Sequence, residues 1–308
     1  MEETKNVGQA GEFEVLEEAL LPPVNEFKRF IRVFFRRKVV IIGFALVVLV
    51  IFVAIFADLI SPYDPYEQDL HNVMAAPNGA HLLGTDALGR DLLSRIMYGT
   101  RIALIVGVLT VLISAVIGVA IGLVAGFAQS KVQTVIMRLT DALIAIPSLI
   151  LQLLLANLLK SFIGGMGSVV VALGLTMFPG YIRMVNAQVL TLKQNDYVLA
   201  GRAMGDKKRR IVLRHILPNA VSPLIVMMTM MMGASIMAEA GLSFLGLGIA
   251  PPAAAWGQMC REGYQYLMTR PLLSIAPGFA IMILVFSYNM VGDGLRDALD
   301  PRLRGSLD

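Results

Sequence analysis

Long apolar segments recur along this chain. The first covers residues 39–60, and a helix of about 20 apolar residues crosses a hydrocarbon core of about 30 Å. Five further segments follow at residues 102–127, 135–159, 169–190, 220–247 and 272–291. Arg183 and Asn186 make the fourth of the six the least apolar. The 308 residues are 56% hydrophobic and 16% charged, whereas soluble domains carry about 25% charged residues. The expected fold class is therefore all-α, a polytopic membrane protein with six transmembrane helices.

The basic residues give the expected orientation. If the N-terminus is cytosolic, 20 of the 26 Lys and Arg residues fall on the cytosolic side of these six segments. The outer side keeps Arg90, Arg95, Arg101, Lys160, Arg261 and Arg270. Because cytosolic loops carry the excess of Lys and Arg, the sequence predicts that both termini are cytosolic (N-in/C-in).

The N-terminal region divides into distinct parts. Residues 1–25 are polar and acidic without an apolar h-region, so we expect a cytosolic tail and an uncleaved first span. Residues 26–38 alternate apolar and basic side chains; this favours either an interfacial amphipathic helix or a basic flank of the first span. We expect an N-terminal part at 26–98 and a permease core at 99–308, whose residues 191–219 form a basic cytosolic loop.

Several classes of chemistry are disfavoured. One cysteine, Cys260, allows no intrachain disulfide, and His71, His81 and His215 stand too far apart in the sequence to suggest a metal motif or a hydrolase triad. No G-x-x-x-x-G-K-[ST] phosphate loop occurs. The chain is thus expected to be no enzyme, to have no cofactor or metal and no nucleic-acid partner, and to depend on another subunit for ATP.

The loop at 191–219 carries the strongest local pattern. Asp196 is a suitable N-cap, and Gly205 suits the left-handed position that ends a helix. Asp206 is expected to cap a second helix that runs to about Leu217, and Pro218 to begin the next span. The expected structure is helix, glycine turn, helix at the cytosolic surface.

This loop resembles the hallmark of binding-protein-dependent ABC importer permeases, E-A-A-x3-G-x9-I-x-L-P. The matching residues are Ala200, Gly205, Leu217 and Pro218. The departures are Leu199 for Glu, Gly201 for the second Ala and His215 for Ile. The R-H-x-L-P-N form at Arg214–Asn219 is similar to the dipeptide/oligopeptide branch.

Two further motifs support the same family. His81–Arg95 resembles the G-T-D-x-x-G-R-D-x-x-S-R motif of peptide permease C-type subunits, and Gly292–Arg302 resembles their closing G-D-x-L-R-D-x-L-D-P-R. The resemblance implies the type I importer permease fold in a bacterial inner membrane. It also implies a second homologous permease, two cytosolic ATPase subunits, an external solute-binding protein and membrane lipid as partners. The residues implied in ATPase coupling are Ala200, Gly201, Arg202, Gly205, Arg214, His215, Leu217 and Pro218.

Other polar residues have alternative interpretations. Asp86/Arg90 and Asp91/Arg95 have i, i+4 spacing, which predicts an outer-surface helix or a contact with the binding protein. Glu239, deep in the fifth span, is either a buried hydrogen-bonded residue or part of the translocation path.

Two packing features also carry expectations. Gly118, Gly122 and Gly126 are expected to let another helix approach closely. Trp256 is expected to be an interfacial anchor.

Rival functions remain at this stage. The same architecture imports nickel, glutathione or another small solute in related systems. An ion-coupled secondary carrier is the more distant alternative, but it needs paired intramembrane acids, and Glu239 has little nearby. The sequence does not identify the transported solute.

Overall fold

The computed structural model describes residues 26–299, and apart from one isolated bridge between Thr85 and Asp91, its regular elements are helices. The acidic tail at 1–25 and the end of the closing motif, from residue 300, lie outside this range. The helices are α2 (Glu26–Phe34), α3 (Lys38–Ile60), α4 (Leu92–Phe127), α5 (Ser130–Ala145), α6 (Ser148–Ile163), α7 (Gly165–Leu192), α8 (Asp196–Ala203), α9 (Lys208–Ile211), α10 (Leu217–Phe244), α11 (Trp256–Tyr264) and α12 (Leu272–Leu299).

The long helices confirm a polytopic membrane protein. Within residues 26–299, five helices are long and apolar enough to cross a bilayer: α3, α4, α7, the continuous helix Lys208–Phe244 that contains α9 and α10, and α12. The pair α5 and α6 gives a sixth span if it is counted as one.

The third expected span, at residues 135–159, is not one straight helix. It consists of α5 and α6, which meet at an angle of 90°. Ile146, between the two helices, has an extended backbone (φ −77°, ψ 129°). Pro147 follows it, and the residue before a proline is disfavoured in the helical region. Apolar periodicity alone did not reveal this break.

α4 is the central helix of the bundle and begins ten residues before the expected span. The boundary expected between residues 98 and 99 therefore falls inside this helix, and the outer loop ends at Asp91. α4 lies against α7 through the glycines at 118, 122 and 126, as expected. A Cβ on Gly122 would stand 2.8 Å from the Cβ of Val185, so only a residue without a side chain allows this approach.

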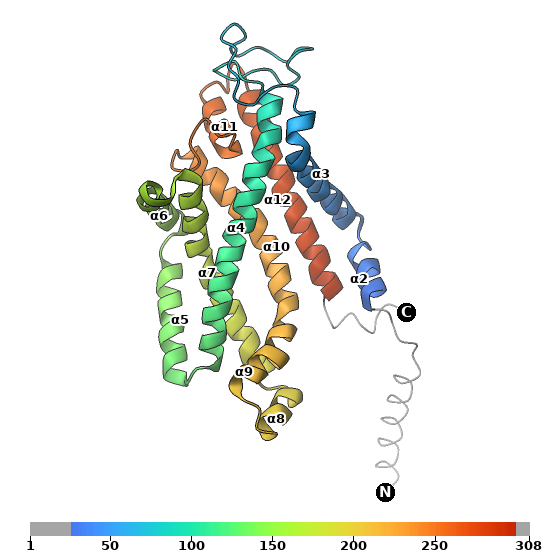
Figure 1. Ribbon diagram of the computed structural model, residues 1–308, viewed down its shortest axis with the longest axis vertical. Coiled ribbons are helices and arrows are strands. Elements are labelled where there is room, and N and C mark those ends of the chain that lie inside the picture. Colours follow the sequence, from blue (N-terminus) through green and yellow to red (C-terminus); the bar gives the residue numbers. More distant parts are fainter. Residues whose placement is uncertain (1–25, 300–308) are drawn as a thin grey trace.

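Figure 1 shows that, apart from the link between α5 and α6, most irregular segments lie toward the two ends of the bundle. The loop between α3 and α4 lies with α11 at one end, and α8 and α9 lie at the other. α2 is a separate helix, and its Val33 and Phe34 pack with Val40 and Ala298 beside the end of α12. Part of its apolar face thus contacts protein.

The N-in/C-in orientation predicts a sided labelling pattern. A cysteine introduced at Asn78, in the exposed loop before α4, should react with a membrane-impermeant thiol reagent in intact spheroplasts. A cysteine at Met204, whose side chain is 80% exposed at the opposite end, should react only after permeabilisation. The reverse pattern would show that the orientation is wrong.

Candidate functional site at the two ends of the bundle

α8 is held against the bundle by a small hydrophobic cluster. Val198 of α8, Ile211 of α9 and Ile216 are 0%, 2% and 0% exposed. They pack with Val185 and Val189 near the end of α7. The cluster therefore joins α8, α9 and the residues before α10 to the end of α7.

Gly205 forms the corner between α8 and α9. Its φ of +82° lies in the left-handed region, which favours glycine. The Gly205 N–H donates to the Arg202 carbonyl, and the Asp206 N–H donates to the Gly201 carbonyl, both at 3.0 Å. These are the two bonds of a Schellman motif, so the role expected for Gly205 in ending the helix is confirmed.

The expected capping roles of Asp196 and Asp206 are wrong. The N-cap residues are Asn195 and Lys207, and neither makes a side-chain cap bond. Asp196 already lies in the first helical turn of α8. Asp196 lies one residue after the N-cap of α8, and Asp206 lies one residue before the N-cap of α9. Neither carboxylate therefore marks where its helix begins.

Asp206 has a different partner. Its carboxylate lies 3.2 Å from Arg210 Nη1 and 3.8 Å from His215 Nε2. A Cβ on Gly201 would stand 3.5 Å from Asp206 Oδ2 and 3.6 Å from His215 Nε2, which are ordinary contacts. The Asp206 carboxylate therefore contacts only the segment that follows the corner, and alanine would fit at position 201.

The second helix of the corner was expected to end at about Leu217, but it continues into α10. Residues 212–216 form a π-helical turn in which the Leu217 N–H donates to the Val212 carbonyl. Helix 208–244 is thereby continuous in spite of Pro218, which has no N–H to donate. The loop is joined rigidly to α10.

The outward face of the corner is apolar with a basic rim. Leu199 and Met204 are 47% and 80% exposed. Burial, with Arg202 and Lys208 nearby, lowers the pKa of Lys193 below its ordinary value. The exposed basic residues are Arg202, Lys207, Lys208, Arg209, Arg210 and Arg214. This surface suits an acidic or amphipathic protein partner.

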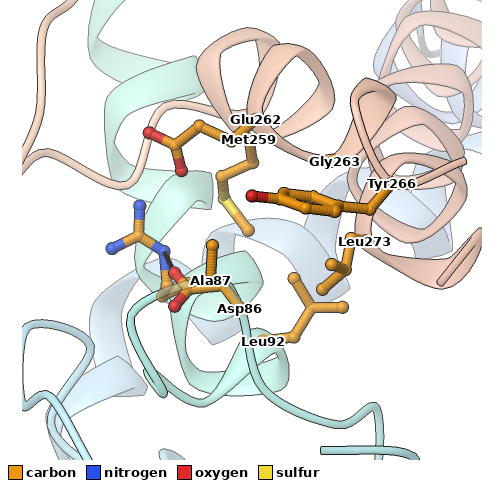
Figure 2. Close-up of a pocket in the computed structure, with 9 residues that line it drawn as sticks. Asp86, Ala87, Leu92, Met259, Glu262, Gly263, Tyr266 and Leu273 are labelled. Atoms are coloured by element: carbon orange, nitrogen blue, oxygen red, sulfur yellow. Dashed lines mark ion pairs between the residues drawn. The ribbon is translucent and has the colours of Figure 1, made fainter. Parts of the chain in front are cut away.

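At the opposite end, charged side chains connect the outer loop to α11; Figure 2 shows Asp86 of the loop and Glu262 of α11 on the same pocket. Arg90 Nε donates to Asp86 Oδ2 at 2.6 Å, and Arg90 Nη2 lies 3.3 Å from Glu262 Oε2. Arg95 Nε lies 3.5 Å from Asp86 Oδ2. The Arg90 and Arg95 side chains are only 4% and 1% exposed. The charges balance within the cluster, as buried charges require.

The helix expected over Asp86–Arg95 is wrong in its first half. Gly84 and Gly89 have φ values of +82° and +75°, so residues before 92 form turns. α4 begins only after Asp91, its N-cap. The i, i+4 spacing of the charged residues does not reveal that the glycines among them adopt positive φ.

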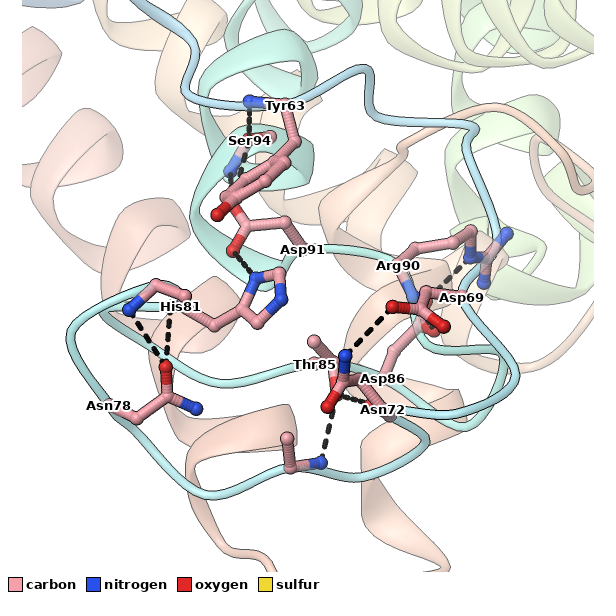
Figure 3. A network of polar contacts seen from close by, with 12 residues as sticks. Tyr63, Asp69, Asn72, Asn78, His81, Thr85, Asp86, Arg90, Asp91 and Ser94 are labelled. Atoms are coloured by element: carbon pink, nitrogen blue, oxygen red, sulfur yellow. Dashed lines mark hydrogen bonds and ion pairs between the residues drawn. The ribbon is translucent and has the colours of Figure 1, made fainter.

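Asp91 is also not paired with Arg95. Its Oδ2 accepts from the Ser94 N–H at 2.8 Å and from the Ser94 hydroxyl at 2.7 Å, and its Oδ1 lies 2.9 Å from His81 Nδ1 (Figure 3). Asp91 therefore both caps α4 and fixes the loop that precedes it.

Trp256 and Glu239 are both in the interior. Trp256 is 3% exposed and donates from Nε1 to the Ile96 carbonyl at 3.0 Å, so the expected interfacial anchor is wrong. α11 packs against α10 and α12, and its first residue, Trp256, lies against α4 at Gly99. Glu239 is 3% exposed and accepts from the Ser243 hydroxyl at 2.5 Å. Of the two alternatives for Glu239, the structure shows buried, hydrogen-bonded surroundings.

One polar contact between α5 and α7 was not expected from the sequence. Arg183 Nη2 donates to Asp141 Oδ1 at 2.6 Å and joins α7 to α5. From the sequence, Arg183 counts among the 20 cytosolic basic residues and weakens the fourth apolar segment, and Asp141 carries no expectation. The available signal was an acid inside an apolar segment.

The comparisons with known proteins decide the family. Residues 118–305 match the family described as binding-protein-dependent transport system inner membrane component. The chain belongs to this family. Residues 25–77 match the N-terminal TM domain of oligopeptide transport permease C. The resemblance inferred from three motifs is thus confirmed, and the protein is a multi-pass inner-membrane permease subunit of an ABC importer.

Relatives of this permease align along nearly its whole length. The glutathione transport system permease protein GsiD of Pectobacterium atrosepticum is 40% identical, over 93% of this chain and 96% of its own. The dipeptide transport system permease protein DppC of Escherichia coli K12 is 41% identical, over 92% and 95%. An inward-facing structure of the MetNI methionine ABC transporter matches with a TM-score of 0.57 and 23% identity, over 68% of this chain and 96% of that chain. That likeness confirms the fold.

Proposed function

We propose that this permease forms half of the translocation path of an ATP-driven importer of di- or oligopeptides. The observation that carries the proposal is the corner formed by α8, Gly205 and α9, whose apolar outward face is exposed at one end of the bundle. The names of the relatives, which include dipeptide and glutathione permeases, support the solute class.

The corner is suited to transmit force from an ATPase. Helix 208–244 has 37 residues and is about 55 Å long at 1.5 Å per residue. α8 is attached to α7 through Val198, and α9 continues into α10. When two ATPase subunits close on ATP, movement of Ala200–Leu217 would tilt α7 and α10 together and change which side of the membrane the path opens to.

The remaining partners follow from the same assembly. A second homologous permease would complete the path within the lipid bilayer, and an external solute-binding protein would deliver the solute at the outer end. Asp86, Arg90, Asp91 and Arg95 are 8%, 3%, 3% and 1% exposed. We propose that they fix the shape of the outer loop that the binding protein contacts.

Glutathione is the second candidate solute, because a glutathione permease is among the similar relatives. Glutathione is itself a peptide with free carboxylates and a free ammonium group, so both candidates share the same recognition chemistry. Uptake of labelled dialanine and of labelled glutathione by the complete assembly in proteoliposomes distinguishes them.

If the ATP site lies in separate ATPase subunits, the behaviour of the isolated permease can be predicted. Purified alone, it should hydrolyse no ATP and accumulate neither solute, because the ATP site belongs to the ATPase subunits. The complete assembly should accumulate solute only with ATP. Uptake by the isolated chain driven by an ion gradient would favour the secondary carrier instead.

A further inference from the structure

Asp141 and Arg183 form an ion pair between α5 and α7, each more than two helical turns from the helix end nearest α8. Asp141 lies eleven residues after Ser130, the start of α5, and Arg183 lies nine before Leu192, the end of α7. At 1.5 Å per residue, these positions are about 16 Å and about 14 Å from the helix ends nearest α8. The two side chains nevertheless stay 42% and 49% exposed in this chain.

This exposure restricts what lies beside the pair. Charged groups facing lipid are costly, and in membrane proteins they face an aqueous cavity or another protein surface. The pair therefore marks a face of α5 and α7 that is turned away from lipid.

A helix break lies at the same depth. α5 ends at Ala145, one turn beyond Asp141, and α6 leaves at 90°. The carbonyls of the last turn of a helix lack partners within it. Ile146, at the break, is 42% exposed. Irregular backbone at membrane depth is tolerated where it is buried in protein or lines a water-filled cavity, and here it is exposed on this chain.

Polar contacts continue along the same side of α7. Thr176, Arg183 and Asn186 are spaced by seven and three residues and so share one helix face. Gln152 Nε2 of α6 donates to Thr176 Oγ1 at 3.3 Å, and Gln133 Nε2 of α5 donates to Asn186 Oδ1 at 3.1 Å. The ion pair is the exposed centre of a polar track in otherwise apolar helices.

We propose that Asp141 and Arg183 line the water-filled solute path and exchange their mutual bond for the two charged ends of a peptide. Arg183 receives the terminal carboxylate, which a guanidinium binds through two parallel hydrogen bonds, and Asp141 receives the terminal ammonium. The exchange leaves no uncompensated charge at membrane depth. This inference rests on the proposed function as a peptide permease.

Cysteine accessibility tests whether the pair lines the path. Burial raises the pKa of the native Cys260 thiol to about 11, so it reacts slowly at neutral pH; Cys260→Ser removes it altogether. In that background, Asp141→Cys and Arg183→Cys are expected to react with a charged, water-soluble thiol reagent in the assembled transporter. Dialanine under turnover conditions should slow the reaction. Val185→Cys, on the buried side of α7, should not react.

Neutral variants test recognition. Asp141→Asn and Arg183→Gln are each expected to lower dialanine uptake roughly tenfold, the effect of losing one charge-assisted hydrogen bond. Dialanine affinity of the binding protein and co-purification of all subunits should not change. The double variant should be worse than either single one, since each residue binds a different end. Lys160→Gln, an exposed charge at the end of α6, should transport like the parent.

Each contrary result identifies what fails. No labelling at either position in any nucleotide state would show that the second permease covers the pair, and would overturn the inference. Recovery of parental uptake in the double variant would show a purely structural ion pair, and would also overturn it. If the parent assembly transports neither dialanine nor glutathione, the proposed peptide function fails and peptide recognition with it, while labelling still decides whether the pair lines the path.

Discussion

Asp86→Ala is expected to destabilise the outer end of this permease by about 3–5 kcal/mol, the usual cost of removing one partner from a buried charge cluster. The carboxylate of Asp86 accepts from the N–H groups of Leu88 and Arg90 and from Arg90 Nε, and it lies 3.5 Å from Arg95 Nε. Its loss leaves two guanidinium groups buried with Glu262 as the remaining acid. We expect the loop before α4 to become protease-sensitive and the purified complex to melt at a lower temperature.

A graded series separates charge from hydrogen bonding at this position. Asp86→Asn keeps an oxygen acceptor for the two N–H groups and should be less destabilising than Asp86→Ala. Asp58→Asn, which removes a carboxylate that is 65% exposed, should have little effect. Melting and proteolysis of Asp86→Ala equal to those of the parent would mean that the outer cluster does not hold the loop.

Gly205→Val is expected to abolish solute uptake while the protein still accumulates in the membrane. The φ of +82° at Gly205 costs a residue with a Cβ about 1–2 kcal/mol, and a β-branched residue more. No atom lies within 4 Å of the added Cβ, so the cost comes from backbone conformation alone. One to two kcal/mol lowers the population of the observed corner about 5- to 30-fold, so co-purification with the ATPases should weaken.

Two variants serve as controls for this prediction. Gly205→Asn adds a side chain of similar size but tolerates the left-handed region, so it should keep most of the uptake. Gly201→Ala, four residues earlier in the same loop, makes only ordinary contacts and should behave like the parent. Parental uptake and assembly in Gly205→Val would show that the corner has no coupling role; harmless replacement of the whole Ala200–Leu217 loop would contradict the coupling proposal itself.

Local sequence was sufficient for the five unbroken spanning helices of the described residues and for the glycine corner, but not for the break between α5 and α6. A run of apolar residues long enough to cross the bilayer has few alternatives to a helix, because lipid offers its backbone no hydrogen bonds. Gly205 was identifiable because a left-handed residue at the end of a helix is a property of that one position. The close approach of α4 and α7 was likewise predicted by the four-residue spacing of Gly118, Gly122 and Gly126.

The predictions that the structure corrects failed for a different reason. Asp91 and Trp256 have partners from other segments, the loop residue His81 and the α4 carbonyl of Ile96. Asp206 pairs with Arg210 and His215 of its own loop in place of capping a helix, because α9 begins one residue later than expected. A carboxylate can cap a helix, pair with a base or accept from a backbone N–H at similar free energy. Which of these occurs depends on what lies within about 3 Å, and spacing along one segment does not report it.

The sequence by itself determined that this chain is a helical membrane protein with a glycine corner between two spanning helices, because chain length in lipid and backbone φ are local constraints. Its motifs, through their resemblance to a known family, indicated a permease. Only the tertiary structure decided where the charges inside the molecule find partners. Asp86 and Glu262 meet the same arginine from positions 176 residues apart, and Asp141 meets Arg183 across two helices. Such pairs form because an unpaired charge is costly away from water, and their geometry exists only after the helices have packed.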